Sequence, residues 1–393
     1  MKLAYVLSGQ QPALGVVRAL GVMGIPIVVM YYKDEDVAYL SKYVTHGVKS
    51  PHPETHEKEF VELLLKSAQE FGDGILFPAS DEALVAVANN KELLETHFDV
   101  PVPDMDIVQR FIEKKYTYEI ADKNGIPAPK TITPTCLEDV VEYAKGIDFP
   151  CLVKPSQSHL FFDHFKRKMF PVENEEELIS VYQQSAEAGL EVMLQEIIPG
   201  DDINVVNYNA YFWEGEPLVE FTAQHIRNAP PWWGSPRVVL SKDIPEVIEP
   251  GRNILKSMGF SGYACTEFKK DDRTGIYKLI EVNGRHNLST SLAVACGINF
   301  PYLQYRHIVE GELPKQSDYK KGVYWIEIIS DITHNFQFLR QEKYSFSEYL
   351  RPYINPNVFA TFALSDLGPY PKRLFIPVKK VFGAVSRKFF GGK

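Results

Sequence analysis

The stretch Gly262–Arg285, GYACTEFKKDDRTGIYKLIEVNGR, decides how the rest of the chain is interpreted. Its composition predicts two short strands joined by a polar turn at Lys270–Gly275, which is rich in Asp, Thr and Gly. If the strands pair as a hairpin, Glu267 lies nearly opposite Glu281, and Asn283 follows one pleat further along. The hairpin would therefore gather three oxygen-bearing side chains.

Strict alternation along the second strand predicts one face that carries Tyr277, Leu279, Glu281 and Asn283. Carboxylates that face each other across a ladder repel unless a cation lies between them. Two Glu and one Asn offer hard oxygen ligands, which suit Mg²⁺ and also Mn²⁺, with water and substrate phosphates completing the shell. The pattern thus predicts a metal site; the alternative is a surface hairpin with solvated acids.

Composition and charge narrow the class of protein. The chain has 393 residues, of which 45% are hydrophobic and 24% charged, values typical of a globular protein with two or three domains. The net charge of −9 and the pI near 5.7 argue against general nucleic-acid binding, because phosphate backbones would repel such a protein. We therefore expect no nucleic-acid partner.

Several features predict a cytoplasmic protein. The four cysteines form no CxxC pair and have no His at zinc spacing, so we expect small buried residues in a reducing compartment. The first residues already predict a strand, so we expect no signal peptide. No apolar run reaches about 18 residues, so we expect no transmembrane helix.

The first hundred residues predict alternating strands and helices. Apolar runs at Leu3–Leu7 and Ile27–Tyr31, separated by an amphipathic segment at Ala13–Met23, predict a βαβ unit and hence a parallel sheet. The loop after the first strand lacks the GxGxxG fingerprint, which argues against a nicotinamide site. Asp81 and Glu82 follow a third strand, where they either cap the next helix or face a ligand.

The middle of the chain adds three polar signals, each weak alone. A helix predicted over Ile107–Asn124 carries Lys114 in its middle. A strand over Phe149–Lys154 ends in a lysine that either reaches solvent or binds a phosphate. A strand over Val192–Ile198 leads into backbone, amide and carboxylate groups that could hydrogen-bond an adenine edge and a ribose diol.

The order of these motifs resembles that of a known superfamily. A helical Lys precedes GIPAP, and VKP, QEIIPGDD, a Glu and EVNGR follow in turn. In this order the chain resembles the ATP-grasp superfamily, specifically its carboxylate–amine ligase-like members, described as predicted ATP-dependent carboligases. The resemblance covers about residues 1–310 in pattern.

The resemblance implies an α/β and α+β architecture. It consists of an N-terminal Rossmann-like (pre-ATP-grasp) domain followed by a two-subdomain ATP-grasp fold that clamps ATP. The implied parts are residues 1–105 for the Rossmann-like domain, residues 106–312 for the ATP-grasp domain, and residues 313–393 for a C-terminal extension with a basic amphipathic tail.

The resemblance also implies roles for single residues. The implied nucleotide-binding residues are Lys114 and Lys154 at the phosphates, Gln195, Glu196 and Ile198 at adenine, and Asp202 at the ribose. The implied metal ligands are Glu267, Glu281 and Asn283. Arg285 matches an arginine that follows the second metal strand, and its planar fork can grip a carboxylate or a phosphoryl group.

The implied reaction joins a small-molecule carboxylate to an amine. ATP phosphorylates the carboxylate to an acyl phosphate, which the amine attacks to give an amide and phosphate. Such a transfer needs positioning and charge neutralisation rather than a protein nucleophile, so no cysteine is assigned to catalysis. The alternative function is a nucleotide-binding or regulatory protein without ligation. A carboxylase is a third alternative, although the chain has no biotin-carrier MKM motif.

Two positions depart from the superfamily pattern. The loop after Lys154, SQSHLFFDHFKRKMF, has no glycine where many ATP-grasp enzymes carry a Gly-rich flap. It is either a basic lid, with Lys168 on a phosphate, or a solvated loop; a degenerate lid would favour binding without turnover. Gly284 stands where related motifs often have proline, a backbone change that leaves the ligands alone.

Two further segments extend the interpretation. In HIRNAPPWWGSPR, His225–Arg237, Arg227 and Arg237 flank Trp232 and Trp233, which suits a site for an anionic organic substrate with Arg227 as a catalytic residue; the alternative is a turn with a half-buried aromatic pair. From Pro371 onward the chain has seven basic residues and no acidic one, so the tail either contacts an anionic membrane face or packs on the protein. A homodimer is the expected oligomer, since dimers are frequent in such enzymes.

Overall fold

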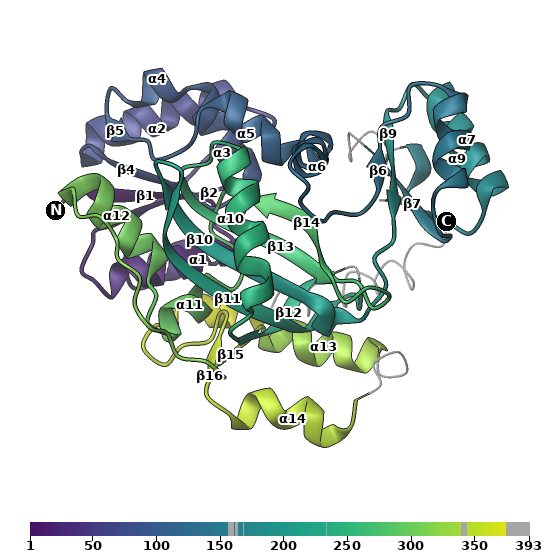
Figure 1. Cartoon of the computed structure of the whole chain (residues 1–393). Helices are drawn as coiled ribbons and strands as arrows, with labels where there is room; N and C mark the ends of the chain where they lie inside the picture. The colour runs from purple at the N-terminus through teal and green to yellow at the C-terminus, as the bar shows by residue number, and fades with distance from the viewer. Residues whose placement is uncertain (156–160, 162–163, 168, 233, 339–343, 375–393) are drawn as a thin grey trace, which may run out of the picture.

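The computed structural model describes residues 1–155, 161, 164–167, 169–232, 234–338 and 344–374. These residues form three sheets, which Figure 1 shows with their covering helices. Lys168, Trp233 and the tail beyond residue 374 lie outside the described residues, as does most of the loop predicted to be a lid. In the described part of the chain, no helix is both long and apolar enough to cross a membrane.

The N-terminal sheet is parallel and has helices on both faces (Figure 1). Apolar side chains of α1 pack on one face, and those of α2 and α3 pack on the other. In spatial order the strands are β3 (Val44–Lys49), β2 (Ile27–Tyr31), β1 (Leu3–Leu7), β4 (Gly74–Pro78) and β5 (Phe98–Asp99). The helices are α1 (Gln11–Gly21), η1 (Ala38–Leu40), α2 (Glu57–Phe71), α3 (Asp81–Asn89) and α4 (Lys91–Leu94). The βαβ prediction is confirmed.

A small antiparallel sheet lies apart from the others in Figure 1. Two helices, α7 (Leu137–Lys145) and α9 (Glu175–Glu187), bury their apolar faces on it. The strands, in spatial order, are β6 (Thr131–Ile132), β9 (Val192–Glu196), β7 (Cys151–Pro155) and β8 (Phe170–Val172). An antiparallel sheet with two helices packed on it matches the α+β subdomain that the resemblance implies.

The third sheet is the largest and holds the hairpin. Its order is β14 (Tyr277–Asn283), β13 (Gly262–Lys270), β10 (Val205–Trp213), β11 (Glu216–Ala229), β12 (Ser235–Ser241), β15 (Tyr324–Ile326) and β16 (Asn357–Phe359). Its helices are α10 (Ile248–Ser257), α11 (Thr290–Ala295), α12 (Phe300–Glu310), α13 (Ile328–Phe338) and α14 (Phe346–Ile354), with η2 (Asp202–Asn204) and η3 (Pro245–Val247). Residues beyond 312 thus add two strands to the sheet that carries the hairpin, and the predicted boundaries between the three parts stay a prediction.

The helix predicted over Ile107–Asn124 is two helices, α5 (Met105–Ile112) and α6 (Lys114–Lys123). Glu113 between them has an extended backbone, with φ −91° and ψ 104°. The prediction of one helix was wrong because periodicity does not reveal a single extended residue. The break makes Lys114 the first residue of α6.

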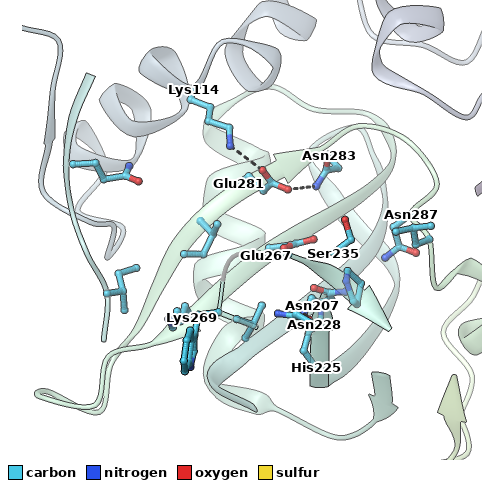
Figure 2. A pocket seen from close by; sticks show the side chains of 18 of the residues that line it. Lys114, Asn207, His225, Asn228, Ser235, Glu267, Lys269, Glu281, Asn283 and Asn287 are labelled. Carbon is cyan, nitrogen blue, oxygen red and sulfur yellow. Dashed lines mark hydrogen bonds and ion pairs between the residues drawn. The ribbon is translucent and has the colours of Figure 1, made fainter. Parts of the chain in front are cut away.

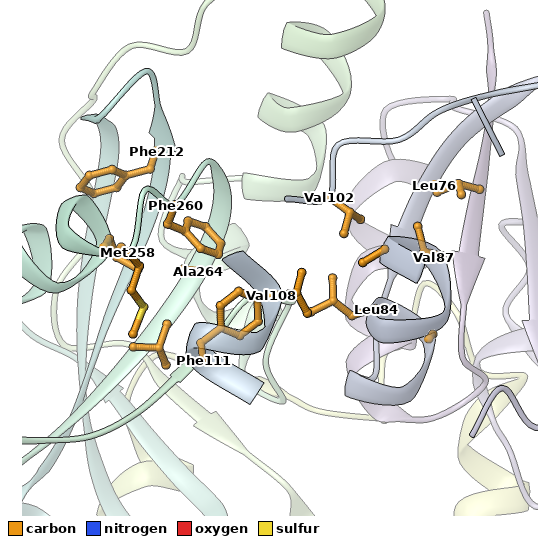
Figure 3. Close-up of a cluster of buried hydrophobic side chains, with 14 of the residues drawn as sticks. Leu76, Leu84, Val87, Val102, Val108, Phe111, Phe212, Met258, Phe260 and Ala264 are labelled. Atoms are coloured by element: carbon orange, nitrogen blue, oxygen red, sulfur yellow. The ribbon is translucent and has the colours of Figure 1, made fainter. Parts of the chain in front are cut away.

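One apolar core connects the N-terminal sheet to the hairpin sheet (Figure 3). Leu84 on α3, Val102 in the linker and Phe111 on α5 belong to the same cluster as Phe260 and Ala264. The prolines before α5 therefore do not separate the two parts. This shared core holds the hairpin at a defined place relative to the N-terminal sheet.

Candidate active site

A cleft of about 380 Å³ opens between the small sheet, the start of α6 and the hairpin sheet. Most of the residues that the sequence analysis selected line it. They are Lys114, Lys154, Gln195, Glu196, Ile198, Glu267, Glu281, Asn283 and Arg285. They come from segments that are up to about 170 residues apart in sequence, so tertiary folding assembles the cleft.

The acidic pair lies at one end of this cleft (Figure 2). Glu267 on β13 pairs in register with Glu281 on β14. Asn283 Nδ2 donates to Glu281 Oε1 at 3.2 Å, which leaves its amide oxygen free of that bond. Burial and the facing Glu281 raise the pKa of Glu267, as expected for two carboxylates at close range.

These side chains fit a divalent cation of the magnesium type. Among the described residues, no group of three or more His, Cys, Asp and Glu side chains could hold a metal ion. The two Glu carboxylates and the Asn283 oxygen would supply only part of a shell. Mg²⁺ accepts such a site because it keeps waters and binds phosphate oxygens.

A β-bulge sets the direction of the second acid. The register shifts between Glu267, opposite Glu281, and Phe268, opposite Leu279, so Ile280 is an extra residue. Leu279 consequently belongs to the apolar core with Phe268, whereas Glu281 lines the cleft. The expectation that Leu279 shares a face with Glu281 was wrong, because alternation does not anticipate an inserted residue.

Lys114 contacts the acidic pair directly. Its Nζ lies 3.1 Å from Glu281 Oε2 (Figure 2). Glu281 raises the pKa of Lys114, and Lys114 in turn lowers the pKa of Glu281. Tyr118, one turn further on α6, donates to the Ile280 carbonyl at 2.6 Å, so the bulge also anchors this helix.

Lys154 enters the cleft from the small sheet. It is the fourth residue of β7, and its Nζ donates to Gln195 Oε1 of neighbouring β9 at 2.5 Å. Burial and the nearby Lys114 lower its pKa to about 7. A buried ammonium without an anion is costly, so this side chain is suited to bind an anionic ligand.

The chain segment that leaves the small sheet forms a third side of the cleft. Ile198 is buried there, and the Glu196 carboxylate accepts from Lys278 Nζ at 2.9 and 3.0 Å. Arg273 also pairs with Glu196. The carboxylate of Glu196 thus binds two cations of the hairpin sheet, and the backbone of residues 196–198 lines the cleft.

Arg285 connects the hairpin with the N-terminal domain. Its Nε and Nη2 each donate to the Asp81 carboxylate at 2.8 Å. Ser80 accepts from the Ala83 N–H, so Ser80 and not Asp81 caps α3. The capping alternative for Asp81 was therefore wrong, and its contact with a ligand stays a prediction; Asp81 pairs with Arg285 of the cleft.

Two predicted residues do not line this cleft. Asp202 is buried and accepts from the backbone N–H groups of Asn228 and Trp232, both at 2.7 Å. Arg227 forms a bidentate pair with Asp331 at 2.9 Å and stacks on Tyr349. The direct ribose contact of Asp202 and the catalytic role of Arg227 find no support in these positions, because both side chains bind partners within the protein.

The cleft also holds polar residues that the sequence analysis did not select. Asn207, His225, Asn228, Ser235 and Lys269 line it (Figure 2). They stand on β10, β11, β12 and β13, and their shared face depends on the register between these strands. His225, Asn228 and Ser235 lie in the segment His225–Arg237 that the sequence analysis singled out, but no local signal distinguished them within it.

Comparison with known proteins agrees with this geometry. No protein-family model matches the chain. The chain is 29% identical over 264 residues to the D-aspartate ligase of Enterococcus faecium (strain Aus0004), and this match covers 61% of each protein. The chain therefore spans about three-fifths of that relative.

Solved structures share the fold over a longer range. The L-amino acid ligase from Bacillus licheniformis superimposes with a TM-score of 0.60 at 17% identity, covering 79% of this chain and 74% of that one. N5-carboxyaminoimidazole synthetase from Staphylococcus aureus, complexed with ADP, gives a TM-score of 0.60 at 13% identity, covering 81% and 80%. Identities this low establish the fold alone.

The three sheets and the cleft between them define an α/β protein of the ATP-grasp type. The chain has this fold in common with those two structures, and its sequence is similar to that of D-aspartate ligase.

Proposed function

We propose that this protein is an ATP- and Mg²⁺-dependent ligase that joins a carboxylate to an amine through an acyl phosphate. The observation that carries the proposal is the facing pair Glu267 and Glu281, with Lys114 and Lys154 on the same cleft. D-aspartate ligase and L-amino acid ligase, to which the chain is similar, are named for reactions of this class.

The chain's own residues have distinct tasks in this proposal. Lys114 and Lys154 bind phosphate oxygens of ATP and neutralise charge that spreads during transfer. Glu267, Glu281 and the Asn283 oxygen would hold Mg²⁺, or Mn²⁺ in its place, which supplies Lewis-acid neutralisation of the phosphates. Arg285 orients the substrate carboxylate with the Nη1 side of its guanidinium, because Asp81 already binds its Nε and Nη2 and holds the group in place.

The reaction balances without a protein nucleophile. A carboxylate oxygen attacks the γ-phosphorus of ATP, and ADP leaves. The amine nitrogen then attacks the acyl carbon, inorganic phosphate leaves, and the amine loses a proton to solvent. The cleft must exclude water during this sequence, because the acyl phosphate would otherwise hydrolyse.

The test is ADP release from ATP with a panel of amino acids and other small carboxylates and amines. We expect release that requires one carboxylate and one amine together.

Glu281→Gln should lower turnover by about a hundredfold or more and metal-free ADP affinity by only a few-fold, since it alters transition-state charge. The exposed Glu249→Gln is the matched control. ATP binding without ADP release from any pair would indicate a nucleotide-binding protein instead, and unchanged turnover in Glu281→Gln would refute the metal assignment.

We further propose a cytoplasmic location, with contact of the basic tail to the inner membrane face. The support is the charge of the sequence from Pro371 onward. Full-length protein should float with anionic liposomes, and a version ending at Tyr370 should not. Equal flotation of the two versions would rule this contact out.

A further inference from the structure

A second cavity lies on the opposite face of the hairpin sheet, away from the cleft. We call it the rear cavity; its volume is about 580 Å³, and β11, β12, β15 and α14 contribute to its walls. Along β11, Gln224 and Ile226 line the rear cavity, whereas His225 between them lines the cleft. Side chains alternate along a strand, so the two cavities lie on opposite faces of the sheet.

Another β-bulge explains why Arg227 belongs to the rear cavity. The register shifts between His225, opposite Val239, and Arg227, opposite Val238, so Ile226 is an extra residue on β11. Ile226 and Arg227 therefore both line the rear cavity, although they are neighbours in sequence.

The lining of the rear cavity is mostly apolar. Ile226 and Leu240 contribute aliphatic side chains, and Trp232, Tyr344 and Pro352 contribute rings. Small-molecule sites in proteins are typically concave spaces of about 300–1,000 Å³ with apolar and aromatic walls and a few polar groups. The rear cavity therefore has the size and composition of a site for a small organic molecule with a planar apolar body.

Two arginines line the rear cavity, and they differ in what they already bind. Arg227 is 2% exposed and forms its bidentate pair with Asp331. Arg351 on α14 is exposed, and its guanidinium forms no hydrogen bond or ion pair with the residues that the structure describes. A guanidinium matches a carboxylate in both geometry and charge. Arg351 thus favours an anionic ligand.

Acidic residues of the same lining already bind donors of the protein. Glu348 accepts from the backbone N–H and from the hydroxyl of Ser345, both at 2.7 Å, at the start of α14. Asp201 accepts from the indole N–H of Trp232 at 3.1 Å. These contacts leave the donors of Arg351 unused, so the ligand that complements the rear cavity is an organic carboxylate.

Trp232 connects the rear cavity with the cleft. It lines both cavities and is 43% exposed. Its backbone has a φ of 68°, a left-handed conformation that is strained for a bulky residue, and Asp202 holds it by accepting from its N–H at 2.7 Å. Strained residues that their surroundings hold in place are frequent at ligand-binding sites. A molecule that contacts Trp232 from the rear therefore acts on a wall of the cleft.

We propose that the rear cavity is an effector site for a small organic carboxylate with a planar apolar body, and that Trp232 couples this site to the cleft. The carboxylate binds Arg351, and the apolar body packs against Trp232 and Tyr344. Coupling is reciprocal, so the carboxylate and a nucleotide change each other's affinity by the same factor. The coupling rests on the proposed function, since it assumes that nucleotide binds in the cleft, whereas the rear site itself does not.

The first experiment measures binding to the wild-type protein without nucleotide. The probes are indoleacetate, its neutral analogue indoleacetamide and the cation tryptamine, which share one ring system. Calorimetry should show saturable binding of indoleacetate that is about tenfold tighter than that of indoleacetamide, the effect of one charge-assisted contact. Tryptamine should bind no more tightly than indoleacetamide.

Variants then assign this preference to residues. Arg351→Leu should weaken indoleacetate to the level of indoleacetamide and leave indoleacetamide unchanged. Trp232→Gly, which tolerates the left-handed backbone, should weaken both probes by about tenfold or more, because it removes an aromatic wall. Phe346→Ser, also on α14 but outside the lining, is the matched control and should change neither affinity. Thermal unfolding of each variant checks that it is folded.

A second measurement tests the coupling. Calorimetry gives the Kd of metal-free ADP with and without saturating indoleacetate. We expect the two values to differ by about fivefold or more, the usual size of coupling between two sites. In Trp232→Gly the two values should be equal, because the shared wall is absent. In Phe346→Ser the difference should persist.

Other outcomes would overturn the inference. Absence of saturable indoleacetate binding, equal affinity for indoleacetate and indoleacetamide, or a preference that survives Arg351→Leu refutes the carboxylate site. An apparent Kd for indoleacetate that rises without limit as ATP is added would put the probe in the cleft. An ADP affinity that indoleacetate leaves unchanged refutes the coupling. Failure to bind ADP, with the indoleacetate preference intact, would refute the proposed function and the coupling but support the rear site.

Discussion

The protonation state of Lys154 should differ between the free protein and the nucleotide-bound protein. Burial and Lys114 lower its pKa from 10.5 to about 7 in the free protein. Because the folded-state pKa is the lower one, the unfolded chain binds more protons between these two values. The contribution of Lys154 to the free energy of unfolding therefore rises with pH over this window.

Nucleotide phosphates should reverse this preference, since they stabilise the ammonium form. At pH 8 we expect metal-free ADP binding to take up about one proton or slightly less per nucleotide. Calorimetry in two buffers with different ionisation enthalpies measures the uptake. Lys154→Met should abolish it, and the exposed Lys145→Met should not. Identical uptake in wild type and Lys154→Met would mean that Lys154 keeps its proton state when nucleotide binds.

Residue type alone did not predict which polar groups face the cleft. Asp202 was selected from the resemblance and Arg227 because it flanks Trp232 and Trp233, yet both are used inside the protein, on Asn228 and Asp331. His225 and Lys269 were not selected, although they line the cleft. The difference depends on side-chain direction, which the packing between distant segments determines.

At the scale of elements, the end of the hairpin is packed against α5. A Cβ at Gly284 would lie 2.5 Å from Phe111 Cζ and 3.2 Å from Phe260 Cε2. These two rings form an edge-to-face pair with centroids 5.6 Å apart (Figure 3). The glycine in EVNGR therefore makes room for an aromatic contact between the hairpin sheet and the helix that precedes Lys114.

Gly284→Ala should lower the free energy of unfolding by about 1–3 kcal/mol, the usual cost of overpacking a core. Urea denaturation measures this loss. Phe111→Leu in the same chain should recover part of it, because the smaller side chain removes the closest contact. Gly47→Ala, where the nearest atom would lie at 3.5 Å, is the matched control and should have little effect. A Gly284→Ala protein as stable as the wild type would contradict this account.

The bulge at Ile280 is the second feature of this element that matters for function. It points Leu279 into the core and Glu281 into the cleft, and its carbonyl accepts from Tyr118. Composition predicted the hairpin, and the structure confirms that Glu267 faces Glu281. The bulge was not predictable, because an inserted residue leaves no mark in the pattern of apolar and polar residues.

At the scale of the whole molecule, a group of ion pairs joins the small sheet to the hairpin. Lys278 lies 2.9 Å from Glu196 Oε1 and 3.0 Å from Asp271 Oδ2, and Arg273 contacts both acids. Asp271 is fully buried. These contacts sit where the chain leaves the small sheet, at the side of the cleft.

Lys278→Met should cost about 1–3 kcal/mol in the free energy of unfolding, because it leaves partly buried acids with fewer cations. Urea denaturation gives this value, with the exposed Lys270→Met as control. The double variant with Glu196→Gln should lose less than the sum of the single losses, since both changes remove the same contact. Additive losses would show that the two residues act independently.

The sequence by itself determined the parallel N-terminal sheet and the hairpin. It also marked Lys154, Glu267 and Glu281 as candidate site residues. These follow from periodicity and turn composition, which act over a few neighbouring residues. The tertiary structure decided the break before Lys114, the bulge at Ile280 and the placement of His225 and Lys269 in the cleft. Each of these depends on register and packing between segments far apart in the chain, and local sequence patterns carry no record of such contacts.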